Sequence, residues 1–394
     1  MPGGYTKNAE AASVIGDKLI VRTPRGVLAF DRRSGRKIWG RDEELDQTID
    51  LTEDVVAIRR SLAGRTEVTI YDPSTGKALW QFESSDGGGI SNDVYTADGE
   101  YKHWSMTRRD LHTGKPKWTI TAERRWQMAE SKLGPAASGS MAAYRGGPYV
   151  MLTSGEGAKD VVLYAVDAET GARHASMPLV DGHHVITDRT LVGLDPESRD
   201  CKVLLRGVDI RTGETRWNIE LRTALHSWFV AECPGRSHAL YSDASWLGIA
   251  PNTLFSIDAQ DRPIALDLDT GVVRWRGPWG LVPVDADEHT VLVRDASGLE
   301  LKVEKYWEKG RLAALDAKTG KLLWRATNPP LETSYTVTAV HGDIALDGGR
   351  HGRQITVRNA RTGVELQPVE GSLIGAGPGW LVATYDDMLR YYTL

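Results

Sequence analysis

The stretch Leu312-Ala-Ala-Leu-Asp-Ala-Lys-Thr-Gly-Lys-Leu-Leu-Trp324 decides the fold of this chain. An apolar run ends in Asp316, and a second apolar run begins after Thr319-Gly320 and ends in Trp324. In a tight turn, an aspartate accepts backbone N–H bonds and glycine supplies the positive φ. The stretch therefore predicts a β-hairpin, with Trp324 lying across a neighbouring unit to bury its large apolar ring.

The same pattern recurs along the whole chain. Its copies begin at Asp31, Asp72, Asp110, Asp167, Asp209, Asp267, Asp316 and Asn359, each followed four positions later by a glycine. Six of the eight copies end in tryptophan, while Ala175 and Gln367 take that place in the other two. The composition agrees, since 13 tryptophans against 4 phenylalanines indicate that tryptophan holds a repeated position. Self-similarity at a steady period predicts a repeat architecture.

Two further strands can be read between successive turns. Before Gly171, for example, β-rich runs cover Ser140–Tyr144, Tyr149–Leu152 and Val161–Val166, and a fourth run follows the turn. Four strands in about 40–50 residues are typical of a β-propeller blade. No stretch shows sustained helical periodicity. We expect an all-β chain in which residues 1–394 form a single propeller domain of four-stranded antiparallel blades.

The repeat resembles that of the PQQ-like, or quinoprotein alcohol dehydrogenase-like, β-propellers, among which BamB-like propellers are the nearest described relatives. The resemblance implies eight blades, closed by pairing of the N- and C-terminal strands. Nine blades stay an open alternative, because three strand-like runs follow the last turn and residues 3–9 could complete their sheet. If the propeller has eight blades, the short interval Gly76–Gly114 is the candidate for an incomplete blade.

Charge and hydropathy exclude some classes of function. Lys plus Arg is 48 and Asp plus Glu is 53, so the formal charge is −5, which argues against broad nucleic-acid binding. No apolar run is long enough to span a membrane. The N-terminus shows no leader, so we expect a cytoplasmic monomer, or a secreted or periplasmic protein if a leader was removed.

Cofactors are not expected. The quinoprotein dehydrogenases carry a vicinal disulfide beside their quinone, whereas Cys201 and Cys233 are 32 positions apart in this chain. The comparison therefore disfavours a quinone. Neither a phosphate-binding loop nor a zinc-binding helix motif occurs.

The loops predict where a site lies. The Asp turns join the third and fourth strands on one face of the propeller, which we call the turn face. Loops between strands two and three, and between blades, lie on the opposite face, which we call the long-loop face. It is expected to carry the long loops Ile120–Ser138, Ala244–Asp261 and Asp295–Gly310. Long loops on a rigid scaffold often carry function.

Aromatic, histidine and arginine residues are frequent in these loops. The candidate ligand-binding residues are Arg124, Trp126, His184, Trp228, Trp246, Trp279, Tyr306, Trp307, Arg350 and His351. Aromatic rings could stack on a planar ligand, and arginine could pair with carboxylate or phosphate groups. The alternative is that the tryptophans cap the blades and the charged residues are solvated.

Three residues are candidates for catalysis. His183 and His226 could act as an acid/base pair, and Asp181 could orient a histidine because it points the same way as His183 in an extended chain. We expect a module that binds a small planar ligand or a partner protein on the long-loop face. The alternative is an enzyme of the cyclase, lyase or isomerase type that needs neither metal nor quinone.

Overall fold

The computed structural model describes most of the chain. The described residues are 11–42, 47–51, 54–62, 65–90, 93–100, 103–128, 148–155, 161–178, 184–194, 203–221, 247–250, 252–258, 262–295, 311–327, 336–349, 354–385 and 388–394. Within these ranges the regular structure is entirely β, and no helix has the length and hydropathy needed to cross a membrane.

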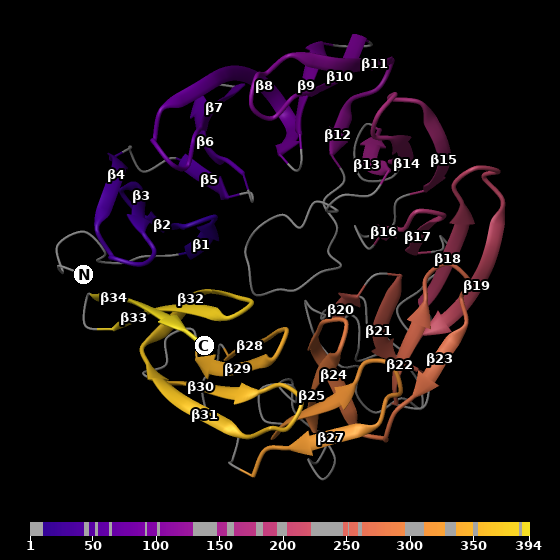
Figure 1. Cartoon of the computed structure of the whole chain (residues 1–394). Coiled ribbons are helices and arrows are strands. Elements are labelled where there is room, and N and C mark those ends of the chain that lie inside the picture. The colour runs from indigo at the N-terminus through magenta and orange to yellow at the C-terminus, as the bar shows by residue number, and fades with distance from the viewer. Residues whose placement is uncertain are drawn as a thin grey trace, which may run out of the picture.

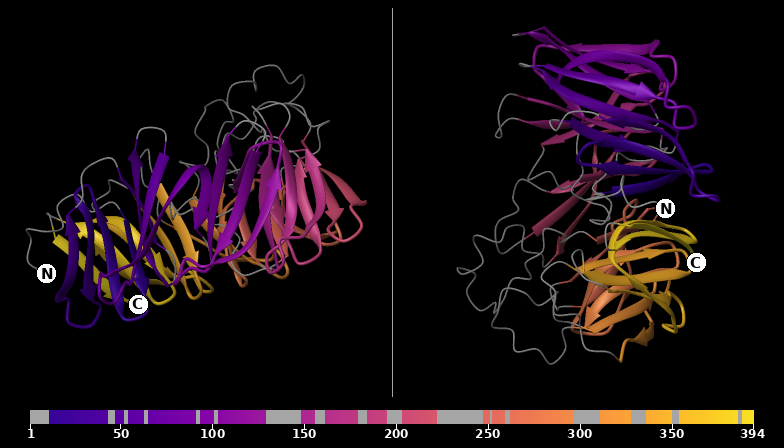
Figure 2. Two further views of the ribbon diagram at one scale, coloured as in Figure 1. Left: turned by 90° about the horizontal axis from the view of Figure 1, so that it is seen from above. Right: turned by 90° about the vertical axis from the view of Figure 1, so that its left-hand side faces the viewer.

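The strands form nine consecutive blades arranged as a ring (Figure 1). Each blade is a meander of antiparallel strands, and the strands run between the two faces of the disc (Figure 2). The expectation of a four-stranded propeller is confirmed for blades 1 to 8, whereas the expectation of eight blades is wrong. Blade 9 has three described strands.

Blades 1 to 3 are built from the N-terminal third of the chain. Their strands are β1 (Ala11–Ile15), β2 (Lys18–Thr23), β3 (Gly26–Asp31), β4 (Lys37–Asp42), β5 (Gln47–Leu51), β6 (Val56–Leu62), β7 (Arg65–Tyr71), β8 (Ala78–Ile90), β9 (Val94–Glu100), β10 (His103–Arg109) and β11 (Pro116–Ala122).

Blades 4 to 6 follow. Their strands are β12 (Trp126–Met128), β13 (Tyr149–Ser154), β14 (Val162–Asp167), β15 (Arg173–Pro178), β16 (His184–Ile186), β17 (Thr190–Leu194), β18 (Val203–Asp209), β19 (Thr215–Leu221), β20 (Leu247–Ala250), β21 (Thr253–Ile257), β22 (Pro263–Asp267) and β23 (Val273–Arg276).

Blades 7 to 9 come last in the chain. Their strands are β24 (Leu281–Ala286), β25 (Thr290–Asp295), β26 (Arg311–Asp316), β27 (Leu322–Arg325), β28 (Thr336–His341), β29 (Ile344–Gly349), β30 (Gln354–Asn359), β31 (Glu365–Glu370), β32 (Ser372–Gly377), β33 (Trp380–Tyr385) and β34 (Met388–Thr393).

The long strand β8 explains why the blade count was underestimated. Its first half pairs with β7 and its second half pairs with β9, so one strand is the outer strand of blade 2 and the inner strand of blade 3. No connecting loop is then needed between the two blades. The short Gly76–Gly114 interval therefore holds a complete blade rather than an incomplete one.

The last sheet lies beside the first. Leu19 and Val21 of blade 1 share a buried apolar cluster with Val382 and Leu389 of blade 9. The expected pairing of residues 3–9 with this sheet falls outside the described residues. Two expected long loops also contain strands, because Ile120–Ser138 includes β12 and Ala244–Asp261 includes β20 and β21.

Each turn is held by the hydrogen bonds that its sequence suggests. The Asp316 Oδ1 atom accepts from the backbone N–H of Thr319 at 2.9 Å and from its hydroxyl at 2.8 Å. The N–H of Gly320, whose φ is 68°, donates to the Asp316 carbonyl at 2.8 Å. The turn of blade 7 also touches the turn between β24 and β25, since the Ala317 N–H donates to the His289 carbonyl at 3.0 Å. Both kinds of turn therefore lie on the turn face.

The repeated tryptophans link one blade to the next. Each indole N–H donates to the carbonyl of the residue just after the first Asp or Asn of the next turn. The pairs are Trp39 to Pro73, Trp80 to Leu111, Trp118 to Ala168, Trp217 to Leu268, Trp275 to Ala317 and Trp324 to Ala360, at 2.7–3.2 Å.

Glycine is required where the indole ring meets the turn. A Cβ atom added to Gly363 would stand 2.6 Å from the Trp324 ring, and the φ of Gly363 is 72°. A side chain at this position would meet both a steric and a conformational penalty. The Thr-Gly pair of the motif thus serves the turn and the blade junction together.

Replacing one of these indoles tests its contribution to stability. Trp324 is 8% exposed, so Trp324→Ala should lower the free energy of unfolding by about 3–5 kcal/mol in urea melts, because a large cavity opens and a hydrogen bond is lost. Leu322→Ala on the same strand is the control. Because Leu322 is 40% exposed, this change should lower the free energy of unfolding much less. A loss below about 0.5 kcal/mol for Trp324→Ala would contradict the packing described above.

Candidate functional site

The structure describes four of the thirteen candidate site residues. Arg124, Trp126, His184 and Trp279 lie within the described residues. The other candidates fall outside them, namely Asp181, His183, His226, Trp228, Trp246, Tyr306, Trp307, Arg350 and His351. Their roles therefore stay predictions.

Trp126 is part of the core rather than of a loop. It opens β12 and has no exposed surface. Its ring packs against Tyr164 at 5.3 Å between centroids, and the Arg173 guanidinium lies 5.5 Å from the centre of the ring. The expectation that Trp126 lies in a long loop is wrong, because this region forms the inner strand of blade 4, and its role in ligand binding stays a prediction.

His184 is also buried. It begins β16, is 1% exposed and pairs with Gly193 on the neighbouring strand. The residues that follow it, Val185 and Ile186, belong to the same buried strand. The expectation of a loop histidine at this position is therefore wrong. The adjacent His183 lies outside the described residues.

Trp279 and Arg124 are exposed in connections between blades, as expected for the long-loop face. Trp279 lies between β23 and β24 with 55% of its surface exposed. Arg124 is exposed between β11 and β12. These connections belong to different junctions of the ring (Figure 1), so the structure does not bring the two side chains together in one pocket.

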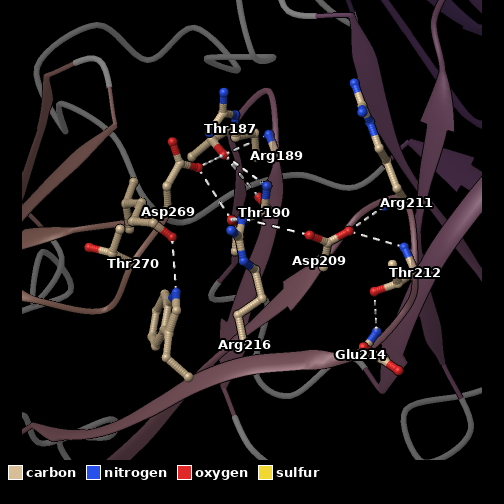
Figure 3. A network of polar contacts seen from close by, with 12 residues as sticks. Thr187, Arg189, Thr190, Asp209, Arg211, Thr212, Glu214, Arg216, Asp269 and Thr270 are labelled. Atoms are coloured by element: carbon tan, nitrogen blue, oxygen red, sulfur yellow. Dashed lines mark hydrogen bonds and ion pairs between the residues drawn. The ribbon is translucent and has the colours of Figure 1, made fainter.

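A polar network, which the sequence did not indicate, joins blades 5 and 6 on the turn face (Figure 3). The carboxylate of Asp269 accepts from the Thr187 hydroxyl at 2.5 Å, the Thr190 hydroxyl at 3.2 Å and the Asn252 amide at 3.2 Å. Arg216 donates to the Thr190 hydroxyl at 3.4 Å. These groups satisfy one another, so the network strengthens the junction that Trp217 also bridges.

A second polar junction joins blades 7 and 8. The Asp285 carboxylate accepts from the Val340 N–H at 2.7 Å, and the Asp287 carboxylate accepts from the Gly342 N–H at 2.9 Å. Burial of Asp285 outweighs these hydrogen bonds and raises its pKa to about 7. Burial lowers the pKa of the adjacent His341, although the charge of Asp287 opposes this shift. The junction therefore contains a carboxyl that titrates near neutral pH.

An open groove lies where blade 9 meets blade 1. It has a volume of about 1100 Å³ and is lined by Arg32, Arg33, Ser34, Gly35, Arg36, Leu389, Arg390, Tyr391, Tyr392 and Thr393. One wall is the turn of blade 1 and the other is the strand β34. Four arginines in one groove suit carboxylate-bearing ligands.

Metal ligands do not gather in the part of the chain that the structure describes. There, no three His, Cys, Asp or Glu side chains lie close enough together to hold a metal ion.

Comparisons with known proteins agree with the architecture. The family model described as outer membrane protein assembly factor BamB matches residues 24–198 and 201–369. No curated protein matches the chain. Among solved structures, the crystal structure of a eukaryotic initiation factor is similar at 10% identity and a TM-score of 0.50, covering 93% of this chain and 89% of that one. At this identity the likeness concerns the fold alone.

Two further solved structures match over most of their length. BamB from Moraxella catarrhalis is 14% identical with a TM-score of 0.43, covering 96% of this chain and 94% of that one. A europium-containing methanol dehydrogenase is 13% identical with a TM-score of 0.43, covering 97% and 83% respectively.

The raised pKa of Asp285 predicts an unusual pH dependence. The folded protein holds this proton more tightly than the unfolded chain, so stability should fall as pH rises from about 4 to the folded pKa of about 7, by at most about 1.4 kcal/mol per pH unit. Asp285→Asn keeps an acceptor for the Val340 N–H and should remove this contribution in urea melts at several pH values. His341 affects stability in the opposite direction. Because its pKa is lowered by burial, the folded protein becomes more stable as the pH rises through the range in which His341 titrates. This contribution is the same in the Asp285→Asn variant. Parallel stability curves for the two proteins would contradict the assignment.

Proposed function

We propose that this chain, a member of the PQQ-like propeller family, is a binding module for a partner protein. The family model that matches it is described as outer membrane protein assembly factor BamB. The partner binds on the long-loop face. The observation that carries the proposal is the position of Trp279, which is more than half exposed in a connection on that face.

The spacing of the exposed candidates supports a protein rather than a small ligand. Trp279 and Arg124 lie at separate junctions of the ring, as suits a broad contact surface. A small-molecule site would need its polar and aromatic groups to converge on one cavity. Tryptophan and arginine are also the residues that most often dominate the energy of protein interfaces.

The turn face is less available for a specific partner. Its recurring Asp, Thr and Gly residues are engaged in hydrogen bonds within the turns, as at Asp316 and Asp209. The long-loop face receives the connections between the second and third strands of the blades and those between most consecutive blades, and their lengths differ along the chain. Loops held by a rigid scaffold can vary without loss of the core.

The catalytic alternative rests on Asp181, His183 and His226. These residues lie outside the described residues, so acid/base chemistry on a small molecule stays a prediction.

Site-specific photo-crosslinking tests the proposal. A photoreactive amino acid at position 279 or 124 should crosslink the same partner protein in cells that express the chain. Matched positions on the turn face, at the exposed residues Lys318 and Ser74, should give no such product. Crosslinks that form from positions 318 and 74 but not from 279 and 124 would contradict the proposal.

The contribution of the indole can then be measured with the identified partner. Trp279→Ala should weaken its binding at least tenfold, or about 1.4 kcal/mol, because an exposed aromatic anchor is lost. The melting temperature should stay within a few degrees of wild type, because the side chain is mostly outside the core. Leu366→Ala, an equally exposed apolar change on an outer strand, is the control.

A further inference from the structure

Indole contacts join blades 1 to 4 in one unbroken series and blades 5 to 8 in another. The tryptophans are Trp39, Trp80 and Trp118 in the first series, and Trp217, Trp275 and Trp324 in the second. We name blades 1 to 4 the first arc and blades 5 to 8 the second arc, and they lie on opposite sides of the ring (Figure 1). Each series ends where Ala175 or Gln367 stands at the tryptophan position.

The sequence repeats with the same division. The family model matches the chain twice, over residues 24–198 and 201–369, and each match holds four of the eight turns. In both sets the first three motifs end in tryptophan and the fourth does not. The missing indole between blades 4 and 5 therefore belongs to a four-blade period and is not an isolated substitution.

The turn of blade 5 lacks the packing that the same turn receives within an arc. Gly213 has a φ of 73°, as the glycines that accept an indole do. A Cβ atom built on Gly213 would meet nothing within 4 Å, whereas at Gly271 it would stand 2.4 Å from the Trp217 ring. Gly213 is exposed, while Gly171 and Gly320 are buried beneath their indoles. The outer rim of the junction between blades 4 and 5 is thus less tightly packed.

Adaptable side chains fill the inner part of this junction. Tyr149, Met151 and Met177 of blade 4 share a buried apolar cluster with Ile186 and Ile210 of blade 5. A methionine side chain is unbranched and flexible, so it adjusts to changes in its surroundings. Apolar packing is also non-directional. This cluster therefore holds the two blades together without fixing one angle between them.

The junctions on either side carry polar links as well as an indole. Between blades 3 and 4, Arg108 pairs with Glu169 at 3.5 Å and Arg173 donates to the Thr121 carbonyl at 3.2 Å. Between blades 5 and 6, Asp269 accepts two hydroxyl hydrogen bonds from blade 5. Hydrogen bonds weaken steeply when their geometry changes, so they resist rotation of one blade against the next. In the part of the chain that the structure describes, the contacts between blades 4 and 5 are apolar.

We propose that the junction of blades 4 and 5 is a hinge about which the two arcs move as units. The second arc also ends without an indole contact, because blade 9 has no turn of the repeated kind to receive one. Arg124 lies on the first arc and Trp279 on the second. Resting on the function proposed above, a partner that contacts both residues fixes the angle between the arcs, and that angle regulates its binding.

Double electron–electron resonance on the full chain tests the hinge without a partner. Spin labels are attached at the third residue of four turns, after Cys201 and Cys233 are replaced by serine. The exposed positions are Arg33, His112, Arg211 and Lys318, in blades 1, 3, 5 and 7. Labels at 112 and 211 span the hinge, whereas the pairs 33/112 and 211/318 lie within one arc at the same separation in blades. The distance distribution across the hinge should be at least twice as wide as within either arc. Equal widths would overturn the proposal.

Thiol reactivity gives a second measure of the hinge. Ala175 at this junction and Ala360 at the junction of blades 7 and 8 are 2% and 0% exposed. In the same cysteine-free background, Ala175→Cys should react with a maleimide at least tenfold faster than Ala360→Cys, because the hinge opens locally. Circular dichroism melts verify that both variants are folded and equally stable. Equal rates at equal stability would contradict a hinge.

The link to binding is tested with the partner that crosslinks to positions 279 and 124. Its addition should narrow the distribution for labels at 112 and 211 and slow the labelling of Ala175→Cys. Values that do not change when the partner is bound would overturn the regulatory role of the hinge. If no partner crosslinks, the function proposed above fails, whereas the measurements on the free chain still decide whether the hinge exists.

Discussion

The contact between an indole and a glycine of the next turn is the interaction on which this propeller depends. A strand meander buries only part of its apolar surface, and each blade must pack on its neighbours to complete a core. Trp275 and Trp324 do this with a buried ring and with a hydrogen bond to the turn of the next blade. The glycine in that turn leaves the space that the ring occupies. Because one contact sets both the spacing and the orientation of neighbouring blades, its repetition generates the ring.

Some blade junctions lack the contact between an indole and a glycine, and others add further contacts to it. Ala175 replaces the tryptophan at the junction of blades 4 and 5, and a Cβ at Gly213 would meet nothing within 4 Å. Between blades 7 and 8, the buried carboxylate of Asp285 and the half-buried carboxylate of Asp287 add hydrogen bonds to the indole link. At the junction of blades 9 and 1, four arginines line an open groove. The variable parts of the fold are thus found at its edges and junctions.

The fold was predictable from the sequence because its determinants are local. Asp316, Thr319 and Gly320 shape a turn within five residues, and Trp324 acts at a fixed distance from it. The blade number depends on less local information, since β8 serves two blades without a turn between them. The burial of Trp126 and His184 was also not predictable, because a three-residue strand gives too short a pattern to distinguish from a loop. The arginine groove combines residues about 355 positions apart and could be recognised only in three dimensions.

A double-mutant cycle on Trp324 and Gly363 tests the central contact most directly. A Cβ at Gly363 would stand 2.6 Å from the indole, so Gly363→Ala should destabilise the protein strongly when Trp324 is present. In the Trp324→Ala background the same change should cost at least about 1 kcal/mol less, leaving only the strain of alanine at a positive φ. Such coupling in the free energy of unfolding would support indole-to-glycine packing as the link between blades. Additive effects of the two substitutions would contradict it.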